Sequence, residues 1–302
     1  YDQFGDGTVD PTAIQRYIRH AVEKLGTQYV LLVGGDSYDY KNYLGLGGMS
    51  FIPSLYAATD DLVRYAPVDP LLADVNGDGV PDVPIGRLPV RTMTELQTLL
   101  TKIGQYETKS YAKTAVLAAD KGFGADADTF ADALPSDWSV ERAYLDQMTA
   151  VQAKELIKTQ VNLGTALLGF VGHSGPTLWT YQGLFNTTDA RNLANVGRPT
   201  LVSQWGCWNT YYVEPRYNTL AQSFLVVGPQ GAAAVLGATT LTQDNAERAL
   251  GTALTPLLAQ PGMTIGDALQ RAKRQVAAQN PAARDVLLGW TILGDPTQVV
   301  TP

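Results

Sequence analysis

Continuous apolar runs that stop at glycine or at a polar residue recur along this chain, and they limit its fold more than any other feature. YVLLVGG at residues 29–35 is the first such run, and TAVLAAD at residues 114–120 is another. A strand that is apolar at every position is typical of a parallel strand buried on both faces of a sheet. We therefore expect both runs to be interior strands of a parallel sheet.

Segments with helical periodicity separate these strands. Asp10 and Pro11 suit a helix start, and large apolar residues then recur at helical spacing to about Gly26. Thr92 and Glu95 form a capping box for a second helix. We expect further helices at 125–134, 149–159, 217–227, 243–258 and 264–279, and further strands at 85–90, 139–144, 164–171, 199–205, 231–238 and 286–292. This alternation predicts an α/β fold with doubly wound, mostly parallel sheets and flanking helices.

The length of 302 residues allows one large domain or two small ones. The helix that ends near Thr108 comes just before a new buried strand, so we divide the chain into two side-by-side subdomains, 1–108 and 109–302. Residues 36–84 are irregular and rich in glycine, aspartate, proline and tyrosine. Loops this long usually have a function of their own or are tied down by a ligand such as a metal.

Composition excludes several classes of protein. The net charge is −7 and the basic residues are scattered, which argues against nucleic acid binding because that needs clustered lysine and arginine. No apolar run approaches the roughly 18–20 residues of a membrane span. The chain has one cysteine, so it forms no internal disulfide.

Two of the expected strands end on residues that can do chemistry. TALLGFVGHSG leads into His173, and PTLVSQWGC leads into Cys207. Ligands bind beyond the carboxyl ends of parallel strands, and strands close in sequence are often neighbours in the sheet. A cysteine beside a histidine has the makings of a nucleophile and its acid/base partner. A lone cysteine is, however, more often a small buried apolar residue, and this pattern alone leaves both interpretations open.

A second constellation is ADVNGDGVPD at residues 73–82. Asp74, Asn76 and Asp78 alternate, with Val80 and Asp82 continuing the spacing, as in the first half of a calcium loop. The bidentate glutamate of an EF-hand is missing at Ile85. The pattern predicts a structural Ca²⁺ site formed by this loop, or else a turn that binds no metal. A site this incomplete would be filled in an extracellular medium.

Several motifs together resemble one family. They are YVLLVGGDSYDY, DGVPDVPIGRLPVRT, VGHSGPTLW, GCWN, GAAAVLGAT and LGDPT, and they extend through nearly the whole chain. The order and spacing of the histidine and cysteine motifs, with the PIGRLPVRT block, are the specific part. The chain resembles the catalytic domain of gingipain-type cysteine peptidases, in the clan that also holds caspases and legumain.

The resemblance implies a caspase-like fold and a cysteine endopeptidase acting on protein or peptide substrates. It makes Cys207 the nucleophile and His173 the general acid/base, with backbone N–H groups of Cys207 and Ser174 holding the oxyanion. A carboxylate from an upstream strand end orients the histidine in gingipains. Asp120 ends the strand 114–120 and is matched to that role by position. The resemblance also implies a secreted protein, with a propeptide before this segment and an immunoglobulin-like module after it.

The sequence departs from the family pattern in places. The usual GHGS is replaced by Gly172-His173-Ser174-Gly175, a glycine after the cysteine is replaced by Thr210, and a glutamate in the next helix is replaced by Gln222. Trp179, Trp205 and Trp208 lie near both motifs, and we expect them to form walls of the substrate pocket, although core positions are the commoner place for such residues. Two alternatives stay open: a transpeptidase of the same fold, and an inactive binding or scaffold domain.

Overall fold

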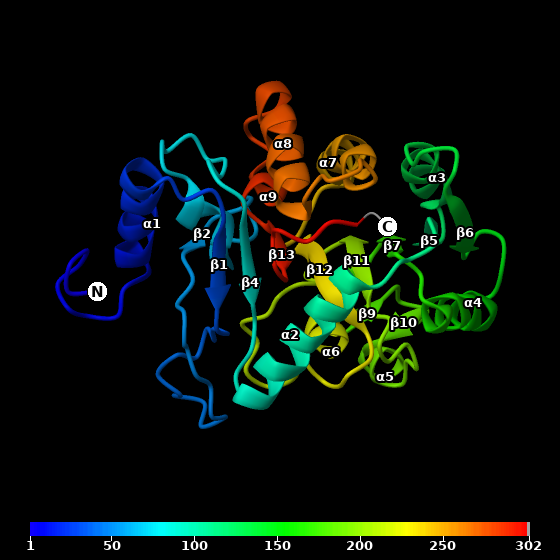
Figure 1. Ribbon diagram of the computed structural model, residues 1–302, viewed down its shortest axis with the longest axis horizontal. Coiled ribbons are helices and arrows are strands. Elements are labelled where there is room, and N and C mark those ends of the chain that lie inside the picture. The colour runs from blue at the N-terminus through cyan, green and yellow to red at the C-terminus, as the bar shows by residue number, and fades with distance from the viewer. Residues whose placement is uncertain (301–302) are drawn as a thin grey trace.

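One sheet of eight strands runs through the computed structural model, which describes residues 1–300 (Figure 1). Its strands lie in the order β1–β4–β13–β12–β11–β7–β5–β6. Their bounds are β1 Val30–Val33, β4 Ile85–Leu88, β13 Trp290–Leu293, β12 Ala232–Ala238, β11 Thr200–Trp205, β7 Leu167–Val171, β5 Thr114–Ala119 and β6 Ser139–Tyr144. Every neighbouring pair is parallel except β12 and β13. The predicted α/β fold with a mostly parallel sheet is confirmed.

The sheet crosses the predicted subdomain boundary. The boundary itself coincides with the end of α2 (Met93–Thr108), but β13 from the second region pairs with β4 from the first. Because β13 is antiparallel to β12, the strands β1, β4 and β13 run opposite to the other five. The two regions therefore share one mixed sheet instead of carrying separate sheets.

Helices cover both faces of this sheet (Figure 1). One face carries α3 (Gly124–Asp132), α7 (Asp244–Leu258), α8 (Ile265–Gln279) and α9 (Arg284–Leu287). The other carries α2, α4 (Ala150–Leu163), α5 (Thr187–Arg191) and α6 (Leu220–Leu225). The first helix, α1 (Pro11–Leu25), packs beside β1 and a short 3₁₀ helix, η1 (Asp69–Ala73). In the described part of the chain, no helix combines the length and hydropathy needed to cross a bilayer.

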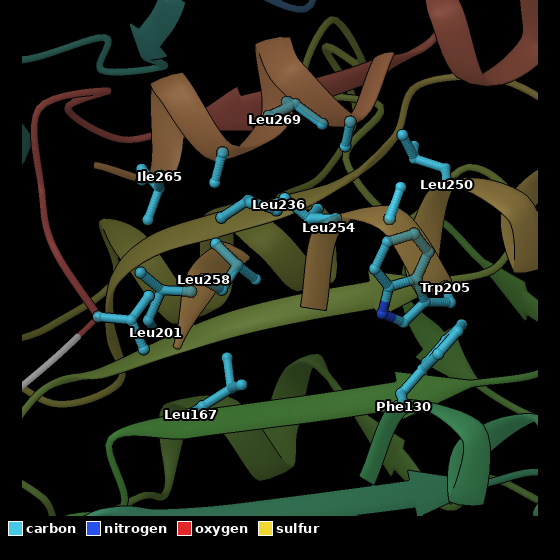
Figure 2. Close-up of a cluster of buried hydrophobic side chains, with 14 of the residues drawn as sticks. Phe130, Leu167, Leu201, Trp205, Leu236, Leu250, Leu254, Leu258, Ile265 and Leu269 are labelled. Atoms are coloured by element: carbon cyan, nitrogen blue, oxygen red, sulfur yellow. The ribbon is translucent and has the colours of Figure 1, made fainter. Parts of the chain in front are cut away.

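Large side chains fill the space between the sheet and α7 and α8 (Figure 2). Trp205, at the end of β11, stacks on Trp290 at a centroid distance of 4.0 Å and lies 5.1 Å from Phe130. All three rings are almost fully buried. Burial of side chains this large is a major source of stability, so this core fixes the end of the strand that leads to Cys207.

Two local predictions are wrong. β1 is the edge strand of the sheet, and Leu31 and Val33 are partly exposed on it, so its continuous apolar run does not mark an interior strand. The strand expected at 286–292 begins only at Trp290, because residues 284–287 form α9. Short strands also occur that the sequence did not reveal: β2 Tyr56–Ala57, β3 Ala66–Pro67, β8 Ser174–Gly175, β9 Leu178–Trp179 and β10 Phe185–Asn186.

The region 36–84 is mostly irregular, as expected, and a buried arginine anchors it. Arg87 on β4 is fully buried and pairs with both carboxylate oxygens of Asp69 at 2.7 Å. The same guanidinium donates to the carbonyls of Gly34 and Ile52 at 2.7 and 2.8 Å. It also lies 4.9 Å from the ring centre of Tyr212. One side chain thus joins the irregular region to the segment that follows Cys207.

Candidate active site

The adjacent strands β11, β7 and β5 have their carboxyl ends on the same side of the sheet, which we call the carboxyl edge. β11 pairs with β7 so that Trp205 lies opposite Val171, and Cys207 and His173 each follow two residues later. On its other side β7 pairs with β5, and the Asp120 N–H donates to the Val171 carbonyl at 2.9 Å. The expected proximity of the histidine-bearing and cysteine-bearing strands is confirmed. The sheet thus brings Cys207, His173 and Asp120 to consecutive strand ends.

Glycines allow the loops that carry Cys207 and His173 to touch. A Cβ atom built on Gly206 would overlap the carbonyl oxygen of Gly172 and the hydroxyl of Ser174. Gly172 has φ +142°, a value that side-chain-bearing residues rarely adopt, and a Cβ there would overlap the Cβ of Asp120. The three strand ends therefore meet only because both positions lack a side chain.

The Cys207 thiol is half-buried and faces Thr242. Its Sγ accepts a hydrogen bond from the Thr242 N–H at 3.5 Å and lies 3.6 Å from the Thr242 Oγ1. Burial raises the pKa of this thiol above its ordinary value, although the two Thr242 contacts act to lower it. This shift favours the thiol over the thiolate. Among the described residues no acceptor takes the backbone N–H of Cys207, which leaves a donor free beside the sulfur.

The segment after the thiol is held from several sides. Trp208 has φ +60°, and its N–H donates to the Thr240 carbonyl at 2.9 Å. Asn209 is fully buried; its amide donates to the Gly206 carbonyl at 2.9 Å and accepts from the Ala238 N–H at 3.0 Å. A left-handed backbone at a bulky residue stores strain that its surroundings must hold, and such strain is common at functional sites.

His173 is exposed, and aromatic rings flank its imidazole. Phe123 meets it edge-on at 5.2 Å, and Tyr181 lies at 6.0 Å between ring centres. Asp120 is buried, and its carboxylate accepts from the Lys121 N–H at 2.8 Å. Within residues 1–300 no hydrogen bond joins Asp120 to His173. The structure places Asp120 next to the histidine loop, and its orienting role stays a prediction.

A buried carboxyl group that sequence reasoning missed lies near the thiol. Glu247, in the first turns of α7, is 8% exposed, and burial raises its pKa to about 8. Hydrogen bonds with Thr242, with the Trp290 indole at 3.4 Å and with the Gly206 N–H lower that pKa in part. No local pattern distinguishes Glu247 from a surface glutamate, because its partners come from distant parts of the chain.

Comparisons with known proteins decide the family. The model of peptidase family C25 matches residues 1–301. The chain belongs to peptidase family C25. A search of curated proteins finds no match.

Solved structures share the C25 fold. The arginine-specific cysteine proteinase gingipain R (RgpB) superimposes with a TM-score of 0.81 at 20% identity, covering 99% of this chain and 70% of that one. The complex of the pro- and mature domains of RgpB from Porphyromonas gingivalis gives 0.80 at 20% identity, with coverages of 98% and 71%. A third structure, described only as a protease, gives 0.76 at 14% identity, with coverages of 98% and 71%. This chain is a gingipain-like cysteine peptidase.

Two of the three tryptophans expected in the substrate pocket of this C25 peptidase belong to its core. Trp179 is 0% exposed, stacks on Phe170 at 4.7 Å and donates to the Gln204 amide oxygen at 2.7 Å. Trp205 is 2% exposed and packs on the rings described above. Neither side chain can touch a substrate, so that expectation is wrong for both. Trp208 is partly exposed and remains a candidate wall.

Two departures from the family motifs have a structural reason in this C25 chain. Ser174 follows the histidine, and its hydroxyl donates to the Cys207 carbonyl at 2.9 Å, which ties the two loops together. Gln222 caps the start of α6, and its amide donates to the Tyr212 carbonyl at 3.2 Å. A glutamate carboxylate cannot make that donation. Thr210 is fully buried, and nothing in the described residues accepts from its hydroxyl.

Side chains of the Asp-rich loop make hydrogen bonds to backbone groups and side chains of the same loop. Asp74 accepts from the N–H groups of Gly77 at 2.7 Å and of Gly79 at 2.9 Å. The Asn76 amide donates to the carboxylates of Asp78 and Asp82 at 3.2 and 3.0 Å. Among residues 1–300, no group of three or more histidine, cysteine, aspartate or glutamate side chains is arranged to hold a metal ion.

Proposed function

We propose that this C25 peptidase hydrolyses peptide bonds through a Cys207–His173 dyad and a thioester acyl-enzyme. The observation that carries the proposal is the pairing of β7 with β11, which brings both residues to one edge of the sheet in register. The lack of a side chain at Gly206 lets the two loops approach each other, and the hydrogen bond from the Ser174 hydroxyl to the Cys207 carbonyl joins them.

The first step is attack by sulfur on the scissile carbonyl carbon. Because burial favours the protonated thiol, its proton passes to the His173 imidazole as the carbon–sulfur bond forms. The N–H groups of Cys207 and Ser174 then hold the oxyanion; one such donor is worth about 2.7–4 kcal/mol in enzymes where it has been removed. The carbon–nitrogen bond breaks as the His173 imidazolium gives a proton to the leaving amine. Water finally attacks the thioester, which restores the thiol and releases the acid.

Two further roles belong to this proposal. Asp120 orients His173 after a movement of either loop, since their strand ends are adjacent. Trp208 lines the substrate pocket, because it follows the nucleophile and its side chain is partly exposed. Its ring packs edge-on against Tyr211 at 5.0 Å, which limits the positions that it can adopt.

A peptide library tests the hydrolysis proposal. The wild type is incubated with the library and Ca²⁺ beside Cys207→Ala, and Cys207 is labelled with thiol-reactive peptide probes. We expect cleavage and labelling by the wild type only. Cleavage that survives in Cys207→Ala excludes this nucleophile. Absence of both cleavage and labelling in the wild type supports a scaffold domain.

A transpeptidase would form the same acyl-enzyme and pass it to an amine instead of water. The exposed position of His173 leaves room for either acceptor. Product analysis with an added amine separates the two reactions: hydrolysis yields the free acid, and transpeptidation yields the new amide as the main product.

We further propose that Ca²⁺ stabilises the Asp-rich loop and that the peptidase is extracellular. The Asn76 amide lies between the carboxylates of Asp78 and Asp82, where two negative groups need a positive partner. Ca²⁺ supplies that charge to oxygen ligands of this kind. Asp74, Asn76, Asp78 and Asp82 would exchange their hydrogen bonds within the loop for the ion and hold it with the backbone carbonyl of Val80, and millimolar extracellular calcium would keep a weak site filled.

Thermal melts with and without a chelator test the calcium proposal. We expect the chelator to lower the melting temperature of the wild type and to leave that of Asp78→Ala unchanged. Asp137→Ala, which removes an exposed carboxylate elsewhere, is the control and should respond as the wild type does. A wild-type melt that does not respond to the chelator excludes the site. Detection of the native protein in the culture medium of its source tests the location.

A propeptide and a C-terminal module also remain proposals. The pro- and mature domains of RgpB form a complex, and its mature domain has the fold of this chain. A propeptide that covers the edge with Cys207 and His173 would keep the peptidase inactive until it is removed.

A further inference from the structure

A pocket of about 240 Å³ opens beside the imidazole of His173. It is lined by His173, Ser174, Gly175, Leu178, Thr180 and Tyr181. We propose that this pocket binds the side chain of the substrate residue that follows the scissile bond, and that it selects an uncharged apolar side chain there. This inference rests on the proposed function, because it assigns a place to the leaving half of the substrate.

The position of the pocket determines which half of the substrate it serves. Cys207 and the residues that follow it contribute nothing to its lining. Thr242, which contacts the sulfur, follows β12, whereas His173 follows β7 on the other side of β11. The acyl half of a substrate stays bound to sulfur, and the leaving amine takes its proton from the imidazole. The residue that carries that amine therefore passes over His173 and meets the pocket.

The residues that line the pocket determine which substrate side chains it can bind. Apart from the imidazole, no charged side chain faces the pocket. Two of its hydroxyls make hydrogen bonds elsewhere: Ser174 donates to the Cys207 carbonyl, and Thr180 accepts from the Leu184 N–H at 3.3 Å. Leu178 and the ring of Tyr181 supply apolar surface. A charged side chain would lose part of its hydration here, and the only group that could compensate is the imidazole that protonates the leaving amine, so charged side chains are disfavoured.

The size suits one side chain. Sites for whole small molecules usually measure about 300–1,000 Å³, and this pocket is smaller. Tyr181 is 89% exposed in the free protein, so its ring has little packing to lose. Contact with an apolar substrate side chain would bury part of that ring, and this gain would favour leucine or phenylalanine over glycine.

The pocket is built on a fixed turn. Thr180 has φ +61°, and its N–H donates to the His173 carbonyl at 2.8 Å. The hairpin of β8 and β9 is tied to the neighbouring helices, because the Leu220 N–H donates to the Pro176 carbonyl at 2.7 Å and the Thr187 N–H donates to the Thr177 carbonyl at 3.1 Å. A preformed site loses little entropy on binding, which favours its use in selection.

A peptide series tests the inference. The residues before the scissile bond are taken from the sequence that the enzyme cleaves best, and the residue after it is glycine, leucine, phenylalanine, aspartate or lysine. We expect kcat/KM for leucine and phenylalanine to exceed that for glycine by at least about 10-fold, the lower end of what one methylene contributes in a hydrophobic pocket. Aspartate and lysine should fall at or below glycine. Tyr181→Ala and Leu178→Ala should reduce the leucine-to-glycine ratio, and Tyr17→Ala, which removes a tyrosine on α1, should leave it unchanged.

Each other outcome has one meaning. Equal kcat/KM for all five peptides, with no effect of either pocket variant, overturns the inference while the proposed hydrolysis stands. A changed preference at the residue before the bond in Tyr181→Ala assigns the pocket to the acyl half and also overturns it. Failure of the wild type to cleave any peptide instead counts against the proposed function.

Discussion

Two glycine-containing loops of this molecule are held in opposite ways. The Asp-rich loop, residues 74–82, uses its own carboxylates to accept from its own N–H groups, and two glycines in it have φ of +82° and +86°. The Cys207 loop, residues 206–214, has its contacts elsewhere: with Ser174, Ala238, Thr240 and Gln222. Both are irregular segments beyond the regular elements. The first is held mainly by its own side chains, with Gln270 and Arg274 of α8 contacting only its last residues, whereas the second depends on the whole fold.

The difference shows when a sequence motif is enough to predict the structure of a loop. A loop held by its own side chains can form wherever its residues occur in the right order. A loop held by distant residues takes its shape only when the sheet and the helices are complete. The position of the Cys207 sulfur is therefore a property of the fold, and variants far from it in sequence should disturb it.

The largest expected effect comes from Asp69→Asn. This change leaves the fully buried Arg87 guanidinium without its carboxylate, and Arg87 also contacts Tyr212 of the Cys207 loop. Breaking a buried pair by removing one partner costs about 3–5 kcal/mol of unfolding free energy. Asp137→Asn, which breaks an exposed pair with Lys113, should have little effect on the unfolding free energy, because solvent screens that pair. Denaturant unfolding measures both, and equal losses would contradict the view that distant residues hold the loop.

A smaller loss is expected from Asn209→Ala. It leaves the Ala238 N–H and the Gly206 carbonyl buried without a partner, which costs about 1–3 kcal/mol for each unpaired group. Asn76→Ala removes an exposed amide from the Asp-rich loop and should cost about 1 kcal/mol or less. Denaturant unfolding compares the two asparagines directly. A larger loss from Asn76→Ala would reverse the comparison between the loops.

The smallest expected effect is on the pKa of the Cys207 thiol. The negative charges of Glu247 and Asp244 both raise the pKa of the Cys207 thiol, so Glu247→Gln and Asp244→Asn should each lower it. The pH at which iodoacetamide alkylation is half-maximal should move down in both variants, and further in Glu247→Gln. Asp244 is exposed, so added salt should weaken its influence, while the buried Glu247 should keep its own. An upward movement in either variant would exclude this electrostatic account.

Much of the fold follows from the sequence, because apolar runs and helical spacing are local signals. The interior strands, most helices and the proximity of Cys207 to His173 follow from them. The order of the strands does not, since nothing within WTIL shows that β13 runs antiparallel to β12. The burial of Trp179 and Trp205 in the core could not be predicted either, because the register of a strand decides on which face of the sheet a ring lies. The roles of Glu247 and Asn209 in the structure could not be predicted, because their hydrogen-bond partners are distant in sequence.

The place of β13 in the sheet has a consequence for how the protein is made. The strand that joins β4 to β12 is the last of the eight to leave the ribosome, and it carries the Trp290 ring on which Trp205 stacks. A nascent chain that lacks β13 holds Cys207 and His173 but cannot complete the sheet that aligns them. Pairing between such distant strands is slow and comes late in folding. The order of synthesis would thus keep Cys207 and His173 unaligned until β13 has been made.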